Sequence, residues 1–432
     1  MEQRLQLFPI SSRITNNTLS IADCDLNALA ETHGTPLYVY DRAELDHAAS
    51  LYRDSLNSSW PGRWSVTYAG KSFLCGWIAS WAQHQGFTVD CTGQGEIAIA
   101  VHAGVPGEQI LVHGVNKSDA DLLAAFEHAG TIVVDNLHEL KRIVRLREST
   151  HHASIPNLWL RLLPGLAVAT HHSHTQTGHA ESKFGMGFSD FIEAVAFCRQ
   201  NNLPFNGIHF HQGSQFRDPA PLGPAIESAL DLALELNMGQ DWHLSPGGGW
   251  GVAYHEDELP NPPIDEYVQF VTKTILSGVQ ERKLAMPHLH LEPGRSLVAR
   301  AGVAIYRVGT VKQSAGRTWL LVDGGMADNP RHALYGARYS ALSVNRTTGN
   351  IVQNVWVAGP FCESGDVILE DLPLTEIHEG DLLAVPVSGA YHLSMSSNYN
   401  GARRPAALVV ENGQAKLILK RETEQSLLAR EP

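Results

Sequence analysis

Residues 66–91, VTYAGKSFLCGWIASWAQHQGFTVDC, decide the fold because they contain one strand–helix–strand unit. Two short apolar runs, Val66–Ala69 and Phe87–Cys91, flank a segment long enough for a helix. A helical connection of this kind joins two parallel strands of one sheet and covers one face of that sheet. Repetition of the unit along a chain predicts an α/β fold.

The same alternation continues to about residue 292. The strand-like runs are Val66–Ala69, Phe87–Cys91, Ile110–His113, Thr131–Val134, Leu158–Leu163, Gly207–Phe210, Trp242–Leu244 and His288–Leu291. Eight strands separated by helix-length segments predict a (β/α)8 TIM barrel. A doubly wound open sheet is the alternative interpretation, although such a sheet normally has fewer strands.

After about residue 300 the helical periodicity gives way to runs rich in Val, Ile, Leu and Thr, punctuated by Gly, Asn and Pro. These runs are Gly302–Lys312, Thr318–Val322, Ile351–Ala358, Asp381–Val387, Pro405–Val410 and Ala415–Leu419. They predict a C-terminal, mostly antiparallel β-barrel or sandwich domain. The apolar runs Thr18–Ile21 and Pro36–Tyr40 add an N-terminal strand to it. The predicted domains are an N-terminal strand segment (1–40), the barrel (41–300) and the C-terminal β domain (301–432).

Composition narrows the classes of function. The chain has 432 residues and a formal net charge of -13, which disfavours a nucleic acid or an anionic membrane surface as partner. Its five cysteines form no CxxC pair, which argues against a disulfide framework and for a reducing compartment. No apolar run approaches the roughly 18 residues that a membrane helix needs, and the first residues lack the apolar core of a signal peptide. We therefore expect a soluble, cytoplasmic protein.

Polar residues gather at the ends of the predicted strands, where barrel enzymes carry their reactive groups. The residues at these ends are Lys71, Asp90, His113, Arg161, His209, His211 and Glu292. A lysine after a strand is by itself usually a solvated surface residue. A lysine held in a barrel mouth is desolvated, which lowers its pKa and favours a neutral amine able to form an imine.

Glycine-bearing turns follow the last three predicted strands. They are Gly213-Ser214, Gly247-Gly248-Gly249 and Gly294-Arg295. Turns of this kind on neighbouring strands can direct backbone N–H groups at one phosphate. Because neither GxGxxG nor GxxxxGK[ST] occurs, the turns do not indicate a nucleotide site.

Four histidines lie close together at His171, His172, His174 and His179. Histidine clusters can bind a metal, but this spacing matches no strong zinc pattern. A polar loop is the favoured interpretation, and the sequence predicts no metal site.

Several motifs in this order resemble the alanine-racemase-like (fold type III) pyridoxal phosphate decarboxylases, and within them the diaminopimelate decarboxylase family. The matching segments are Tyr68-Ala69-Gly70-Lys71, Ser182-Lys183-Phe184-Gly185, 207–215, 247–249, Glu292-Pro293-Gly294-Arg295, Asp323-Gly324-Gly325-Met326, Arg331 with Leu334-Tyr335-Gly336, Cys362-Glu363-Ser364-Gly365-Asp366 and Gly389-Ala390-Tyr391. The resemblance covers residues 30 to 410 approximately, and the joint order of the motifs makes it specific.

The resemblance implies a carboxy-lyase that binds pyridoxal 5'-phosphate. Lys71 corresponds to the Schiff-base lysine, His211 to the histidine that stacks on the cofactor ring, and Glu292 to the partner of the ring nitrogen. A carboxylate there keeps the nitrogen protonated and strengthens the ring as an electron sink. The implied phosphate-side and other cofactor contacts are Ser214, Gly248, Gly249, Gly294, Arg295 and Tyr391.

The resemblance also implies a substrate and a partner. The implied substrate-binding residues are Arg295, Arg331, Tyr335, Glu363 and Tyr391. Cys362 corresponds to a proton donor supplied by the second subunit of a homodimer with shared active sites. The implied reaction is decarboxylation of meso-2,6-diaminopimelate to L-lysine and CO2, the last step of lysine biosynthesis.

Charge complementarity favours this substrate over its rivals. Ornithine-type relatives usually carry an aspartate right after the tyrosine, where this chain has Gly336. A distal end with both a carboxylate and an ammonium suits two arginines plus Glu363, since arginine forms paired hydrogen bonds to a carboxylate. Ornithine, arginine, a D-amino acid and a siderophore- or carrier-linked amino acid remain alternative substrates, because Ser72-Phe73, Gln212 and His332 depart from the usual pattern. A non-catalytic regulatory homologue is the alternative from another class.

Overall fold

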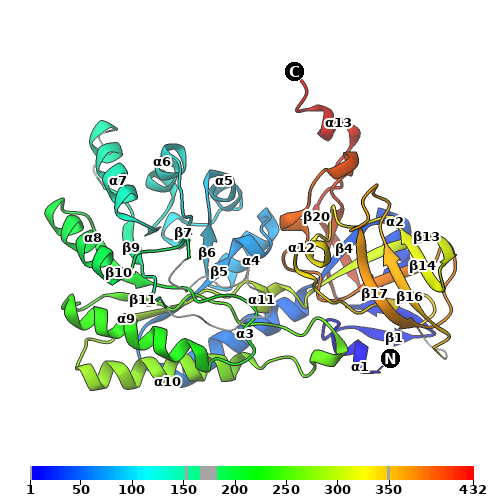
Figure 1. Ribbon diagram of the computed structural model, residues 1–432, viewed down its shortest axis with the longest axis horizontal. Helices are drawn as coiled ribbons and strands as arrows, with labels where there is room; N and C mark the ends of the chain where they lie inside the picture. The colour runs from blue at the N-terminus through cyan, green and yellow to red at the C-terminus, as the bar shows by residue number, and fades with distance from the viewer. Residues whose placement is uncertain (1, 151–153, 166–181, 348–350) are drawn as a thin grey trace. The chain divides into compact units, whose positions relative to one another are not determined.

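The computed structural model describes residues 2–150, 154–165, 182–347 and 351–432, so the histidine-rich segment 171–179 lies outside the described residues. The chain forms two compact units. We call residues 49–251 and 263–294 the barrel unit, and residues 1–48, 252–262 and 295–432 the β unit (Figure 1). The boundaries at residues 40 and 300 remain predictions.

In the described part of the barrel unit, eight parallel strands close into a barrel. The strands are β5 (Trp64–Ala69), β6 (Thr88–Cys91), β7 (Ile110–Val112), β8 (Thr131–Val134), β9 (Asn157–Arg161), β10 (Phe205–His209), β11 (His243–Ser245) and β12 (His288–Leu291). Each strand pairs with the next along the chain, and β12 returns to β5 with Leu289 opposite Trp64. This closure confirms the predicted TIM barrel and excludes the open sheet. The predicted strand limits differ from the observed ones by two residues or fewer.

Helices surround the barrel strands (Figure 1). They are α4 (Gly76–His84), α5 (Gln94–His102), α6 (Asp119–His128), α7 (Leu137–Ser149), α8 (Phe188–Gln200), α9 (Gly223–Glu235) and α10 (Ile264–Arg282), while α3 (Arg42–Ser59) precedes β5. In α10 the buried residues Ile264, Val268, Val271 and Ile275 recur every three or four positions, which is the pattern of a helix with one apolar face. Ser118 begins α6 with a capping box.

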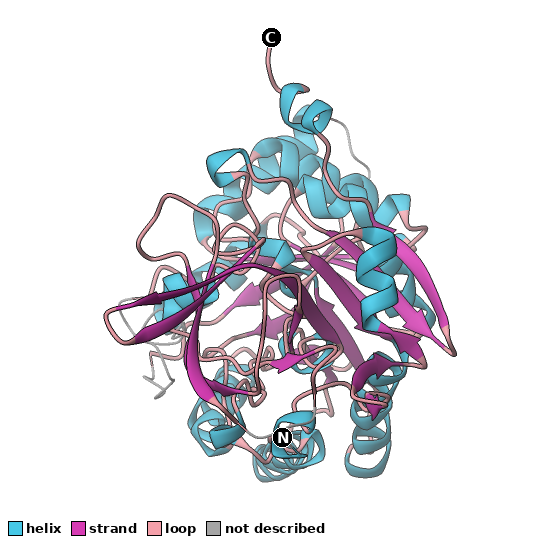
Figure 2. Ribbon diagram, turned by 90° about the vertical axis from the view of Figure 1, so that its right-hand side faces the viewer, coloured by secondary structure: helices cyan, strands magenta, loops and turns pink. Residues whose placement is uncertain are grey.

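The β unit is built around one large sheet (Figure 2). Its strands are β4 (Leu37–Asp41), β13 (Gly302–Ser314), β14 (Arg317–Val322), β15 (Leu342–Ser343), β16 (Gln353–Ala358), β17 (Val367–Leu374), β18 (Leu382–Val385), β19 (Ala406–Glu411) and β20 (Gln414–Leu419). Short helices also belong to this unit: α1 (Glu2–Leu5), α2 (Leu26–His33), α11 (Arg295–Val298), α12 (Arg331–Tyr335) and α13 (Glu424–Leu428).

The N-terminal strand joins this sheet as predicted. β4 pairs antiparallel with β13 and parallel with β19. The β4–β19 and β14–β16 pairs are parallel, and the other described strand pairs of the large sheet are antiparallel. The predicted class, a TIM barrel with a mostly antiparallel β domain that takes up an N-terminal strand, is therefore confirmed.

Two details of the β unit differ from the prediction. The run Thr18–Ile21 (β2) pairs with β1 (Arg13–Thr15) and β3 (Cys24–Asp25) in a separate three-stranded sheet. Two-residue turns with positive φ, at Asn16-Asn17 and Ala22-Asp23, fold this segment back on itself. β17 was not predicted, because Glu370, Asp371 and Pro373 interrupt its apolar pattern.

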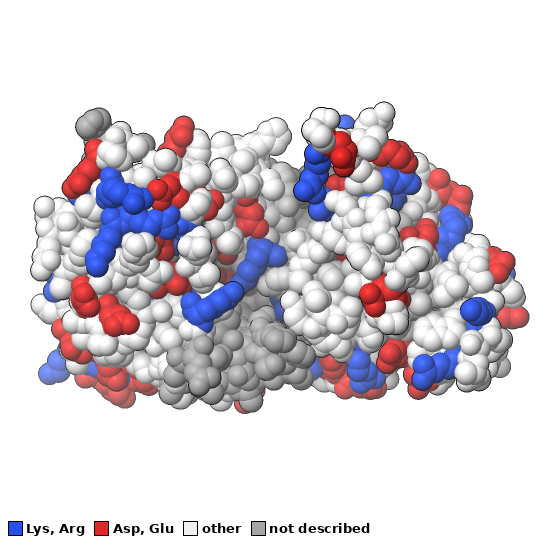
Figure 3. Space-filling model, turned by 45° about the horizontal axis from the view of Figure 1, so that its top comes forward, with Lys and Arg blue, Asp and Glu red and all other residues white. Residues whose placement is uncertain are grey.

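Lys and Arg side chains are interspersed with Asp and Glu over the face drawn in Figure 3. Among the described residues no helix is both long and apolar enough to cross a membrane. All five cysteines are free thiols.

Candidate active site

Lys71 lies where the first barrel strand ends. It is the middle residue of a single 3-10 turn, η1 (Gly70–Ser72), that directly follows β5. The turn packs tightly, because a Cβ atom on Gly70 would lie 2.5 Å from the backbone oxygen of Asp90. Ser72 is buried and donates a hydrogen bond to the backbone oxygen of Ala69 at 2.8 Å. Lys71 itself is exposed, whereas we expected a desolvated lysine.

A buried carboxylate, Glu292, follows β12 at the same end of the barrel. Ser245, the last residue of β11, donates a hydrogen bond to Glu292 Oε1 at 2.6 Å. His209, the last residue of β10, lies 3.1 Å from Glu292 Oε2 through its Nε2 atom, and His113 Nε2 lies 3.4 Å from the same oxygen. We call these four residues the Glu292 cluster.

The Glu292 cluster keeps its carboxylate ionised. Burial by itself would raise the pKa of Glu292, but His209 and His113 hold it well below its ordinary value. Burial lowers the pKa of His209 to about 4, so this histidine is neutral near pH 7. Because an ionised carboxylate only accepts hydrogen bonds, the Nε2–H group of His209 is the donor.

A second carboxyl group in the mouth behaves in the opposite way. Burial, and then the negative charge of Glu292, raise the pKa of Asp90 to about 7. Its Oδ1 atom is buried and has no hydrogen-bond partner among the described residues. The environment thus separates the pKa values of two nearby carboxyl groups, which is typical of sites that move or hold protons.

The glycine turns of the barrel meet as predicted. A Cβ atom on Gly249 would lie 2.3 Å from the backbone oxygen of Gly213, and one on Gly248 would lie 2.0 Å from that of Glu292. These turns follow the neighbouring strands β10, β11 and β12. The backbone N–H of Gly248 donates to His211 Nδ1 at 3.4 Å. The turns therefore form a compact backbone cradle beside the Glu292 cluster.

A second group of predicted residues comes together in the β unit. Arg331 begins α12, Arg295 begins α11, and both are buried. The guanidinium carbon of Arg331 lies 4.3 Å from the ring centre of Tyr254, and that of Arg295 lies 5.7 Å from the same ring. Arg295 donates a hydrogen bond to the hydroxyl of Tyr254, and Arg331 donates one to the hydroxyl of Tyr339.

Tyr391 completes what we call the arginine–tyrosine cluster: Arg295, Arg331, Tyr254, Tyr339 and Tyr391. The guanidinium carbon of Arg295 lies 4.6 Å from the ring centre of Tyr391. The backbone of Tyr391 has a φ of 61°, a left-handed conformation that costs energy in a non-glycine residue and is common at functional sites.

A buried polar chain supports this cluster. The hydroxyl of Tyr339 lies 2.8 Å from His392 Nε2, and the other ring nitrogen of His392 lies 3.3 Å from the hydroxyl of Tyr38. Tyr38 and Tyr306 both donate to Asp328 Oδ2, at 2.9 Å and 2.7 Å. The chain fixes the position of Tyr339 and thereby that of Arg331.

Two further motifs of the β unit are joined by one carboxylate. Asp366 accepts hydrogen bonds from the backbone N–H groups of Met326 at 2.7 Å and Phe361 at 2.9 Å. A Cβ atom on Gly325 would lie 2.2 Å from this carboxylate, which explains the glycine there. Asp366 therefore shapes the loop that carries Cys362.

Three further predicted site residues, Cys362, Glu363 and Tyr335, belong to neither cluster. Cys362 and Glu363 are exposed, and their hydrogen bonds run to Asn400, Ser364 and Gly365. Among the described residues, no hydrogen bond or ion pair joins either of them to Arg295 or Arg331. Tyr335 is half-buried at the end of α12.

Some site residues had no role in the sequence prediction. Asp90, His113 and His209 were noted only as strand-end residues, and Ser245 was not noted, although all four lie at strand ends. Tyr254 and Tyr339 lie in loops and carry no recognisable signal. His392 directly follows a recognised motif, but only the fold places it between Tyr339 and Tyr38.

Comparison with known proteins agrees with this geometry. The family model described as "Pyridoxal-dependent decarboxylase, pyridoxal binding domain" matches residues 42–299. The diaminopimelate decarboxylase of Bacillus subtilis (strain 168) is 39% identical over 420 residues, which cover 95% of this chain and 94% of that protein.

Solved structures give the same result. The crystal structure of diaminopimelate decarboxylase from M. jannaschii in complex with L-lysine has a TM-score of 0.89 and 28% identity, and covers 98% of both chains. That of the Helicobacter pylori enzyme with L-lysine has a TM-score of 0.83 and 30% identity, over 93% of this chain and 98% of that one. The chain therefore belongs to the pyridoxal-dependent decarboxylases, and within them to the diaminopimelate decarboxylase family.

Proposed function

We propose that this chain decarboxylates meso-2,6-diaminopimelate to L-lysine and CO2, using pyridoxal 5'-phosphate bound through Lys71. The observation that carries the proposal is that the family's motifs form two groups of side chains, one in each unit. The barrel unit has an ionised carboxylate and a glycine cradle beside Lys71. The β unit has two buried arginines aligned by tyrosines.

The Glu292 cluster and the cradle would hold the cofactor. When bound, pyridoxal phosphate supplies the electron sink that accepts the electron pair released as CO2 leaves. Glu292, kept ionised by its neighbours, would keep a proton on the ring nitrogen. His211 would contact the ring. The cradle, with Ser214 and Gly294, would hold the phosphate through backbone N–H groups and a hydroxyl.

The arginine–tyrosine cluster would hold the distal end of the substrate. Arg295 and Arg331 are fixed by tyrosine hydroxyls and rings, so little side-chain entropy is lost when they bind a carboxylate. Tyr335 adds a hydroxyl, and Glu363 pairs with the distal ammonium. Tyr391 contacts both cofactor and substrate.

Cys362 would deliver the proton to the α-carbon from the second subunit of a homodimer. Its exposure, and the hydrogen bonds of Asp366 that shape its loop, support a role at a surface shared with a partner. Thiols have pKa values that neighbouring charges can tune for acid catalysis. The free thiols also support a cytoplasmic location.

Mixing two inactive variants tests the shared site. Lys71→Ala and Cys362→Ala damage different subunits of each site, so a mixed dimer regains one intact site. Random exchange of subunits should restore about a quarter of wild-type activity. No recovery after complete exchange would contradict a shared site.

The reaction is tested by incubating purified protein with pyridoxal phosphate and meso-diaminopimelate and measuring lysine and CO2. We expect the two products in equal amounts. Parallel incubations with ornithine, arginine and D-amino acids test the alternative substrates. Faster CO2 release from one of these than from diaminopimelate would overturn the substrate assignment and leave the decarboxylase assignment intact.

A further inference from the structure

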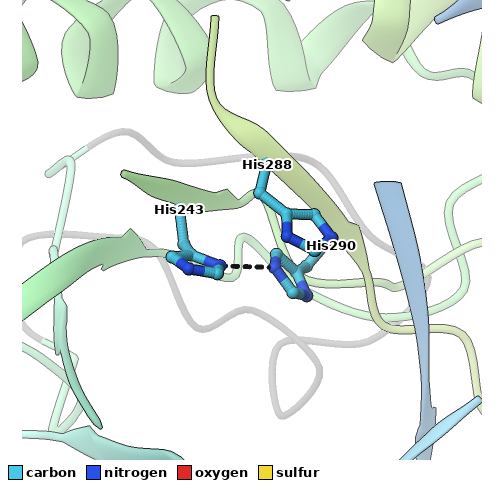
Figure 4. A group of neighbouring side chains, drawn as sticks. All are labelled: His243, His288 and His290. Carbon is cyan, nitrogen blue, oxygen red and sulfur yellow. Dashed lines mark hydrogen bonds between the residues drawn. The ribbon is translucent and has the colours of Figure 1, made fainter. Parts of the chain in front are cut away.

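Three histidines of the barrel unit lie side by side (Figure 4). Two of them begin strands β11 and β12, whereas Glu292 follows the end of β12. His243 is the first residue of β11 and His288 is the first residue of β12, and the two are direct partners in the parallel sheet. His290 lies two residues further along β12, on the same face of the strand as His288. We call these residues the histidine trio.

The ring nitrogens of the trio converge. One nitrogen from each histidine lies within 4.8 Å of the other two, and His243 Nδ1 lies 2.8 Å from His290 Nε2. Histidine nitrogens bound to one zinc ion, each about 2.0–2.1 Å from the metal, are roughly 3–3.5 Å apart. A bound ion would replace the proton that His243 and His290 share. The ring planes lie 28–36° apart, so binding requires rotation about χ2, a soft torsion in histidine.

The trio contains one buried nitrogen with no hydrogen-bond partner among the described residues. This nitrogen is Nδ1 of His290, and burial of this kind is costly for a polar atom. His288 Nε2 lies 2.8 Å from the hydroxyl of Ser65 on β5. The ring of His288 also forms a hydrogen bond with the backbone of Trp64. These contacts orient the ring, as outer contacts do in many histidine metal sites.

Aromatic packing shields one side of the trio. The ring centre of Trp159 lies 4.5 Å from that of His290 and 5.3 Å from that of His243. Gly207 on β10 permits this position, because a Cβ atom there would lie 2.2 Å from the tryptophan ring. His243 and His288 are only half-buried, so an ion could reach the trio from that side.

The surroundings of the trio suit a cation. The nearest charged side chains that influence the trio include Arg63 and Asp241, which form an ion pair at 2.6 Å, so the positive charge of Arg63 is balanced.

We propose that His243, His288 and His290 form a binding site for a divalent transition-metal ion, with Zn²⁺ as the representative, separate from the pyridoxal site. Imidazole ligands suit zinc, copper and nickel, whereas magnesium and calcium prefer oxygen. Three protein nitrogens leave the fourth tetrahedral position to solvent. An ion there ties β11 to β12 and stabilises the folded barrel by mass action. The spacing of the three histidines in the chain matches no zinc motif, so the site is recognisable only in the fold.

The test is zinc binding to untagged, pyridoxal-loaded protein, measured by calorimetry after treatment with a chelator. The variants are His243→Gln and His288→Gln, with His138→Gln on the exposed side of α7 as the matched control. A further variant, His172→Gln/His174→Gln, separates zinc bound by the histidine-rich segment. We expect the trio variants to lose one zinc per chain, or to bind it about 100-fold more weakly, while the control and segment variants keep that ion.

X-ray absorption should then show nitrogen ligands about 2.0–2.1 Å from the zinc, and zinc should raise the Tm of wild type more than that of His243→Gln. Equal zinc stoichiometry and affinity in wild type and both trio variants would overturn the proposal. So would loss of the ion only in the segment variant. Binding is read without turnover, so the outcome is independent of the decarboxylase activity.

Discussion

The Glu292 cluster of the barrel unit and the arginine–tyrosine cluster of the β unit solve different physical problems. The first keeps one carboxylate ionised among neutral histidines and a hydroxyl. The second aligns two permanent cations with tyrosine rings and hydroxyls. The difference teaches that in the barrel unit the protein tunes protonation, whereas in the β unit it tunes orientation. We therefore expect variants of the Glu292 cluster to change the chemical step and variants of the arginine–tyrosine cluster to change substrate recognition.

Lys71→Ala should have the largest effect. Without this amine, the cofactor cannot be held covalently, so activity should fall by roughly 10³-fold or more. The absorbance of the lysine-linked cofactor should vanish, as measured by titration with pyridoxal phosphate. Lys273→Ala, on the exposed face of α10, is the control. An unchanged spectrum in Lys71→Ala would contradict the cofactor assignment.

Cys362→Ala should come next. Loss of the proton donor should lower kcat by about 10²-fold or more, while the cofactor spectrum persists. Ser314→Ala, exposed at the end of β13, should remain close to wild type. If Cys362→Ala turns over normally in stopped-flow and steady-state assays, another group protonates the α-carbon.

Glu292→Gln should lower kcat by about 10²-fold with little change in KM. The amide still accepts the hydrogen bond from Ser245 but cannot hold a proton on the ring nitrogen. Glu266→Gln, exposed on α10, is the control. A change in KM alone would mean that Glu292 acts in substrate binding. It would contradict the proposed difference between the two clusters.

Arg331→Ala should show the opposite pattern. We expect KM for diaminopimelate to rise by about 10–100-fold with the cofactor spectrum unchanged, because a charge-assisted pair to the distal carboxylate is lost. Arg331→Lys should recover only part of this loss, since lysine lacks the paired donors. Arg338→Ala, an exposed arginine of the β unit, serves as control. Little change in KM would point to a substrate without a distal carboxylate.

Asp90→Asn should have the smallest effect, on stability. Burial raises the folded-state pKa of Asp90 to about 7, whereas the unfolded value is about 3.9. The folded state therefore binds this proton more tightly, and its ionisation destabilises the fold increasingly as the pH rises from about 4 to about 7. Asparagine cannot ionise, so the variant should gain free energy of unfolding, by at most about 4 kcal/mol above pH 7.

In cofactor-free protein, the gain in Tm of Asp90→Asn should therefore be larger near pH 8 than near pH 5. Asp54→Asn, exposed on α3, provides the reference for removing a carboxylate. A gain that is the same at both pH values would mean that Asp90 does not titrate in this range.

The two clusters also differ in how far they could be predicted from sequence. The barrel site could be predicted in part, because all strands of a barrel end on one face and residues that follow them lie close together. This applies to Lys71, His211, the glycine turns and Glu292. Cofactor roles could be assigned there only through the family resemblance. Tyr254 and Tyr339 could not be predicted, since loops place them beside Arg331 without any periodic signal. The exposure of Lys71 was also not predicted. The end of a strand determines the position of the lysine backbone, but it does not determine which other residues cover the side chain.

The central claim is that Lys71 carries the cofactor, and reductive trapping tests it most directly. Borohydride reduces the imine between the cofactor and its lysine to a stable amine, and peptide mass mapping then identifies the modified residue. We predict a single pyridoxyl group on the peptide that contains Lys71. A pyridoxyl group on Lys117 or Lys183 instead, or none on the reconstituted protein, would contradict the account.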